Sequence, residues 1–139
     1  MARGEAVSAR YAIGIGARND IDARELADFV RAVAARHGVY LQTATLATIE
    51  ARGDEPGLQG AARSLDMALV FLSLEDLRAR DKDVLTRSAR VEQMFGVGSV
   101  AEAAALAGAG SGSILLAPRA ATRRLTCAIA RAIEGGESP

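Results

Sequence analysis

Short apolar segments that end in Gly-rich or acidic turns recur along this chain, and a segment with helical periodicity follows each turn. The first ends in Gly14-Ile15-Gly16, the second leads from Leu46–Glu50 into Asp54-Glu55-Pro56-Gly57, and a Gly98-Ser99 turn begins a later helix. In an open α/β sheet the carboxyl ends of the strands form the crevice where ligands bind, and the free N–H groups of a helix start favour anions. We therefore expect the function to reside at these turns.

Length and charge restrict the classes of protein to consider. The chain has 139 residues, 50% hydrophobic and 24% charged, which is enough for one domain with a closed core. Its 17 basic and 17 acidic residues balance and only 4% of residues are aromatic, so a nucleic-acid surface is not expected. The single cysteine cannot form an internal disulfide, and no N-terminal apolar stretch has the length of a signal peptide or a membrane span. We expect a cytoplasmic protein with no membrane partner.

The order of the periodic segments predicts a single-domain, three-layer α/β/α sandwich with a mixed, mostly parallel sheet. The domain is expected to span residues 11–134, between a loose lead-in at 1–10 and a tail at 135–139. Predicted strands cover residues 11–15, 46–50, 67–72, 114–117 and 125–130. The last two are candidates for an antiparallel hairpin around a loop at 118–124.

Helix-start signals precede the predicted helices. Asp22 with Glu25, and Ser99 with Glu102, have the spacing of a capping box, and Pro56 suits a first helical position. The first helix is expected to end at His37-Gly38 and the last at 108–110, with a short helical turn at 74–78. For the polar segment 80–93 the secondary structure stays open, with a helical piece before Met94-Phe95 and a mobile loop at 81–83.

Four blocks of the sequence carry a family resemblance. They are Gly14–Arg18, Ala47–Leu58, Gly98–Leu106 and Leu115–Arg131. In order and spacing these blocks are similar to the cobalamin biosynthesis family of CobE and the C-terminal domain of CbiG, over about residues 11–131. The resemblance implies a role in building the corrin ring of vitamin B12.

The family implies two kinds of role. In CbiG-like proteins of the anaerobic route the reaction opens a lactone on a cobalt-precorrin and releases a two-carbon aldehyde, and the domain is fused to an N-terminal partner. A free-standing copy resembles the CobE type of the aerobic route, whose own chemical step is not settled. We expect this chain to be of the CobE type.

The chain also departs from the family at three positions. Ala17 stands where the family commonly has cysteine, and Arg52 and Arg119 stand where it commonly has lysine. A thiol nucleophile is therefore missing at the first position. The planar guanidinium of arginine favours carboxylate binding and argues against lysine-specific covalent chemistry.

The Gly14-x-Gly16 turn has two interpretations besides a dinucleotide loop. The third glycine of the dinucleotide fingerprint is replaced by Asn19, so NAD is not expected, and we expect no other cofactor. The turn either accepts an anion beside Arg18 or allows close packing between strand and helix.

Precorrins are flat macrocycles edged with carboxylates, so a site for them needs fixed cations, backbone donors and an apolar floor. The predicted substrate-binding residues are Gly14, Gly16, Arg18, Thr48, Arg52, Asp54, Gly57, Gly98, Ser99 and Arg119. The competing interpretation of each arginine is a solvated surface charge.

The acidic pair before Pro56 also has two interpretations. Asp54 and Glu55 would offset the dipole of the following helix and cap its N–H groups. Alternatively, Glu55 is a general base that activates water for ester opening. His37 and Cys127 are interpreted as structural, and the spacing of the carboxylates does not predict a metal site.

Three functions follow in order of preference. The first is a binding protein that holds a precorrin or hydrogenobyrinate-type intermediate and passes it between corrin-pathway enzymes. The second is a hydrolase-like enzyme that opens a precorrin lactone with Glu55-activated water. The third is an accessory subunit of another corrin enzyme. Whether the chain is an enzyme stays open.

Overall fold

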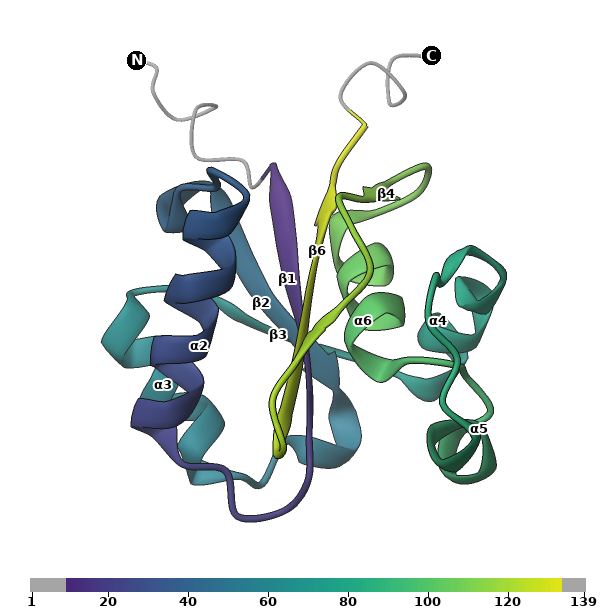
Figure 1. Ribbon diagram of the computed structural model, residues 1–139, viewed down its shortest axis with the longest axis horizontal. Coiled ribbons are helices and arrows are strands. Elements are labelled where there is room, and N and C mark those ends of the chain that lie inside the picture. The colour runs from purple at the N-terminus through teal and green to yellow at the C-terminus, as the bar shows by residue number, and fades with distance from the viewer. Residues whose placement is uncertain (1–9, 134–139) are drawn as a thin grey trace.

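The computed structural model describes residues 10–133, which form one mixed sheet with helices on both faces (Figure 1). The strands are β1 (Tyr11–Ala17), β2 (Ala44–Ile49), β3 (Leu69–Leu72), β4 (Ile114–Leu115), β5 (Ala120–Ala121) and β6 (Leu125–Arg131). Their order is β3-β2-β1-β6-β4, and β5 also pairs with β6. The first three strands are mutually parallel, whereas β6 runs antiparallel to β1, β4 and β5.

Two helical layers cover the sheet. The helices are α2 (Ala23–Arg36), α3 (Pro56–Leu65), α4 (Leu74–Ala79), α5 (Ala89–Phe95) and α6 (Val100–Ala109), with 3-10 turns η1 (Leu41–Thr43), η2 (Glu50–Arg52) and η3 (Asp81–Asp83). Helices α2 and α3 lie on one face, and α6 and α4 lie on the other (Figure 1). The predicted three-layer sandwich with a mixed sheet is confirmed, but the sheet is not mostly parallel, because β6 pairs antiparallel with all three of its partners. The predicted tail lies outside the described residues, as does the predicted lead-in except for Arg10.

Large and small residues alternate along β1, and this alternation determines how closely each helical layer packs on the strand. Ile13 and Ile15 are buried and pack into the core beneath α2 and α3. Gly14 faces the opposite layer, where a Cβ atom would lie 1.9 Å from the carbonyl oxygen of Ala101. Helix α6 can approach the strand this closely only because glycine has no side chain. Close packing, one of the two interpretations of the glycine turn, thus accounts for Gly14.

Some element boundaries differ from the prediction for local reasons. Met67 donates its N–H to Ala62 and so completes the turn after α3, and β3 begins only at Leu69. Strand β4 stops at Leu115, and the predicted loop at 118–124 contains the short strand β5. The antiparallel arrangement expected for the last strands is confirmed by the β4–β6 pairing.

The two predicted capping boxes are only half formed. Asp22 and Ser99 accept hydrogen bonds from the N–H groups of Glu25 and Glu102, as predicted. The reciprocal bonds are not made within the described residues: the Glu25 carboxylate lies 3.8 Å from Arg124, and Glu102 bonds elsewhere. A complete box forms instead at the start of α4, between Ser73 and Asp76.

The polar segment 80–93 is better ordered than the sequence suggests. The predicted helix before Met94-Phe95 is confirmed by α5, whose N-cap is Ser88. The prediction of a mobile loop at 81–83 is wrong, because these residues form η3 and hydrogen bonds hold Asp81 in place. Among residues 10–133, no helix is long and apolar enough to cross a bilayer.

Candidate functional site

A cleft opens where the carboxyl ends of β1 and β2 meet the amino end of β6. Its base includes Gly16, Thr48 and Thr126, and α5 and the start of α6 form one side. This is the edge of the sheet at which the sequence predicts a ligand site. The cavity measures about 190 Å³, which is less than the roughly 300–1,000 Å³ of a cleft that encloses a drug-sized ligand. A cavity of this size has room for a small anion or for one edge of a larger ligand.

The charge of the cleft distinguishes it from the rest of this neutral chain. Six arginines line it: Arg18, Arg52, Arg90, Arg119, Arg123 and Arg124. Within the described part of the chain, no Asp or Glu lies among the lining residues. Like charges gathered in a hollow focus a strong positive potential, because the low-dielectric walls limit screening. The cleft is thus built to attract an anion with several negative groups.

Most of these arginines are not neutralised within the protein. Arg52 is held in place by hydrogen bonds from Nε to the Ala17 carbonyl oxygen (2.8 Å) and from Nη1 to Asn19 (3.0 Å), neither of which is a carboxylate. Arg124 lies 3.8 Å from Glu25 and donates to the Asp20 carbonyl oxygen. Of the six cleft arginines, Arg18, Arg90, Arg119 and Arg123 make no guanidinium hydrogen bond or ion pair with any of residues 10–133.

The side of the cleft that α5 forms is mostly apolar. Val91, Met94 and Phe95 line it from α5, and Val100 continues the surface onto α6. Met94 is 54% exposed, so this wall presents apolar surface to the solvent. The cleft thus combines cations with an apolar wall, two of the three properties expected above for a site that binds a carboxylate-edged macrocycle.

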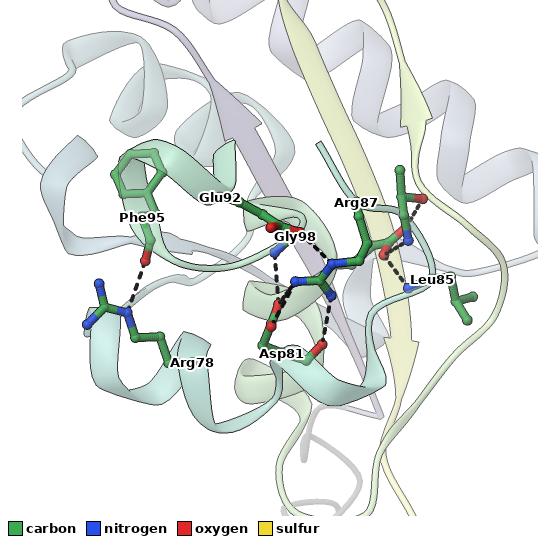
Figure 2. Close-up of polar contacts among 9 residues, drawn as sticks. Arg78, Asp81, Leu85, Arg87, Glu92, Phe95 and Gly98 are labelled. Atoms are coloured by element: carbon green, nitrogen blue, oxygen red, sulfur yellow. Dashed lines mark hydrogen bonds and ion pairs between the residues drawn. The ribbon is translucent and has the colours of Figure 1, made fainter. Parts of the chain in front are cut away.

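Helix α5 has no fully buried residue, and polar contacts add to the packing of Val91 and Phe95 against the core. Figure 2 shows that Asp81 accepts hydrogen bonds from Arg87 (2.9 Å) and from the Gly98 N–H (2.8 Å). Arg87 also pairs with Glu92 on α5, and Arg78 donates to the Phe95 carbonyl oxygen (3.0 Å). Partial burial raises the pKa of Asp81, but the Gly98 hydrogen bond and the Arg87 guanidinium outweigh it and hold the pKa below its usual 3.8.

The structure brings half of the predicted binding residues together. Gly16, Arg18, Thr48, Arg52 and Arg119 all line the cleft. The Thr48 hydroxyl is already engaged, since it donates to the Ile15 carbonyl oxygen at 2.7 Å. Thr48 therefore shapes the base of the cleft and braces the two strands.

The other predicted binding residues lie outside the cleft lining. Gly14 is buried under α6, and a Cβ atom on Gly57 would lie 2.0 Å from the Ile21 carbonyl oxygen, so both serve close packing. Gly98 donates its N–H to Asp81, and Ser99 is buried as the N-cap of α6. Asp54 is exposed.

Glu55, the predicted general base, also lies outside the cleft lining. It occupies the N-cap position of α3 without a side-chain capping bond, so the predicted side-chain cap is wrong. Its Oε1 atom instead accepts a hydrogen bond of 3.3 Å from the Ile21 N–H. Glu55 thus tethers the loop before α2 to the start of α3.

Sequence reasoning missed three of the cleft arginines. Arg90 lies on α5, whose position depends on contacts with residues far along the chain, and no local signal places it. Arg123 and Arg124 lie between β5 and β6. Two adjacent arginines in a short loop within the fourth family block were a usable signal for this part of the site.

A metal ion and a reactive thiolate, two other sources of reactivity, have no support among the described residues. Within residues 10–133, no cluster of three or more His, Cys, Asp or Glu side chains is arranged to hold a metal ion. Cys127 is free and buried on β6, and burial raises the pKa of its thiol to about 12. A neutral thiol of this kind is a poor nucleophile.

Comparison with known families decides where the chain belongs. The model of the family described as cobalamin synthesis G C-terminus matches residues 11–130, which is most of the chain. The chain belongs to the cobalamin synthesis G C-terminus family. The role in cobalamin biosynthesis that the sequence blocks implied is therefore confirmed at the level of the family.

Solved structures agree with this assignment. The crystal structure of CobE, a protein from the cobalamin biosynthetic pathway, is 33% identical, with a TM-score of 0.83 over 89% of this chain and 91% of that chain. The cobalamin biosynthesis protein chiG from Agrobacterium tumefaciens is 32% identical, with a TM-score of 0.67, and the match covers 88% of this chain and 98% of that chain. A homolog of cobalamin biosynthesis protein G from Sulfolobus solfataricus, 19% identical, shares the fold, with a TM-score of 0.63 over 90% of this chain and 37% of that one. No curated protein matches the chain.

Proposed function

We propose that this member of the cobalamin synthesis G C-terminus family binds a precorrin or corrinoid intermediate of the aerobic route in the cleft at the carboxyl ends of β1 and β2. The observation that carries the proposal is that six arginines line the cleft, whereas none of the acidic residues in the described part of the chain does. Tetrapyrrole intermediates of this pathway carry acetate and propionate groups around the ring. Arginine pairs with such carboxylates through two parallel hydrogen bonds.

The size of the cavity indicates how the ligand is held. A cavity of about 190 Å³ accepts one edge of the ring, with its carboxylates directed at the arginines. The apolar wall of α5 would contact a ring face near that edge. The rest of the macrocycle stays exposed, which suits a protein that passes the ligand to other corrin-pathway enzymes in the cytoplasm.

The alternative function, the opening of a precorrin lactone with release of a two-carbon fragment, has less support. That reaction needs a group that activates water close to the bound ester. Glu55 was the residue predicted for this role, and its carboxylate contacts Ile21 outside the cleft lining. Binding and transfer need no such group.

A titration with a pure pigment tests the proposal. The protein is added to hydrogenobyrinic acid, and the absorbance of the pigment is followed in its Soret region. The fully esterified pigment, which has the same ring without the charges, is the matched ligand control. We expect a saturable spectral shift with micromolar or tighter affinity for the acid. The proposal fails if the acid does not bind at micromolar concentrations.

A further inference from the structure

Glu102 has the most unusual environment of any charged group outside the cleft lining. It is the third residue of α6, and it is 0% exposed. Oε1 accepts hydrogen bonds from the N–H groups of Leu85 (2.7 Å) and Thr86 (2.9 Å). Oε2 accepts from the Thr86 hydroxyl (2.7 Å) and from the Arg119 N–H (2.8 Å). Four donors occupy the acceptor sites of this carboxylate, which offsets the cost of burying its charge.

These four bonds join two separate sides of the cleft. Leu85 and Thr86 lie just before α5, which supplies Arg90 and the apolar wall. Arg119 belongs to the segment between β4 and β6 and lines the cleft from the other direction. Among residues 10–133, Glu102 is the only side chain that hydrogen-bonds to both segments.

The helix that carries Glu102 is a rigid base for this connection. Ala101 and Ala105, on either side of it along α6, are fully buried, and Gly14 lets α6 pack directly on β1. The position of Glu102 is therefore fixed relative to β1, the strand that ends just before Arg18. Helix α5 has its own contacts, through Asp81 and Arg87 and through the packing of Phe95, but within residues 10–133 none of these reaches the Arg119 segment, and Glu102 supplies that link.

We propose that Glu102 is a positioning residue of the cleft: its buried carboxylate sets the place of Arg119 and of the α5 wall relative to each other. The inference rests on the proposed function, since it assigns the residue that shapes the binding site. Glu102 does not contact the ligand itself. It acts through the backbone of Arg119 and of the segment before α5.

The variant Glu102→Gln tests this with little change of shape. If the amide oxygen of the new glutamine keeps the hydrogen bonds from the Leu85 and Thr86 N–H groups, its NH₂ group faces the Arg119 N–H. Both groups are donors, so the hydrogen bond to Arg119 is lost. We expect the Arg119 amide to exchange its hydrogen at least about tenfold faster, and the affinity for hydrogenobyrinic acid to fall about tenfold. Glu75→Gln, on the exposed surface of α4, is the matched control and should change neither quantity.

A double-mutant cycle separates positioning from a general structural role. If Glu102 acts through Arg119, then Arg119→Ala weakens pigment binding about tenfold in the wild type and less than about twofold in the Glu102→Gln background. If Arg119→Ala weakens pigment binding by the same factor in both backgrounds, the two residues act independently and the inference is overturned. So would an unchanged exchange rate of the Arg119 amide in Glu102→Gln.

Two further outcomes are distinguished by the same measurements. If the wild type binds no pigment, the proposed function fails, and the exchange rate of the Arg119 amide alone decides whether Glu102 holds that segment. If Glu102→Gln does not fold, Thr86→Val replaces it, because it removes one of the four donors and leaves the carboxylate. We then expect about threefold weaker binding with the fold retained, and unchanged binding would overturn the inference.

Discussion

Gly14 on β1 lies so close to Ala101 on α6 that a methyl group at Gly14 would be 1.9 Å from the Ala101 carbonyl oxygen. This contact brings the start of α6 to the end of the strand that leads to Arg18. The positions of Ser99, Val100 and Glu102 relative to the cleft all depend on it. The glycine turn that drew attention to this edge of the sheet therefore shapes the site through packing.

Replacing Gly14 by alanine is predicted to destabilise the fold. The new methyl group would meet the backbone of α6, which cannot rotate away, and we expect a loss of about 2–3 kcal/mol in the free energy of unfolding. Gly16→Ala on the same strand is the matched control, because its nearest contact is the Thr126 hydroxyl and that side chain can turn. Urea unfolding measures both, and equal losses would contradict the packing explanation.

The cleft arginines whose guanidinium groups make no contact within the protein are predicted to supply most of the free energy of ligand binding. Arg90→Gln and Arg123→Gln should each weaken binding of hydrogenobyrinic acid about tenfold, because each removes a charged hydrogen-bond donor. Arg63→Gln, an exposed arginine on α3 outside the cleft, should bind as the wild type does. Titrations at low and high salt should show weaker binding at high salt. Equal affinity of all three variants would contradict the prediction.

Asp81 is predicted to make the stability of the α5 region depend on acid pH. The folded-state pKa of its carboxyl is below 3.8, so its contribution to stability is complete above about pH 4 and is lost as the pH falls through the folded-state value. Asp81→Asn should therefore be less stable than the wild type at pH 6, and the difference should shrink toward pH 2–3. Urea unfolding across this range measures it, with the exposed Asp28→Asn as control. A difference that does not change with pH would contradict the assignment.

Cys127 is predicted to be inert in the folded protein. Its thiol is 0% exposed and its pKa is raised to about 12, so very little thiolate exists at pH 8. Labelling with iodoacetamide should be slow in buffer and fast in denaturant. Rapid labelling of the native protein would show that β6 is more accessible than the structure indicates.

Periodicity and helix-start signals were enough to predict the central elements, because β1, β2, α2 and α3 each bury a regular apolar face. The same signals failed where long-range contacts decide the conformation. Glu102 has the spacing of a capping residue, yet its carboxylate bonds to Leu85, Thr86 and Arg119 because those N–H groups reach it from other parts of the fold.

The candidate site was predictable where its residues lie next to strands or blocks that the sequence reveals. Arg18, Arg52 and Arg119 follow or adjoin recognisable strands or family blocks, and they do line the cleft. Arg90 could not be placed, because α5 has no fully buried residue and its position depends on polar contacts of Asp81 and Arg87 with distant parts of the chain as well as on partial apolar packing.

The most direct test of the central claim is a calorimetric titration of the wild-type protein with hydrogenobyrinic acid and with its full ester. Recognition of a carboxylate edge by arginines predicts binding of the acid at micromolar or lower concentration and about 100-fold weaker binding of the ester, since two or more charged contacts are lost. Equal affinities for the acid and the ester, or no binding of either, would contradict the claim.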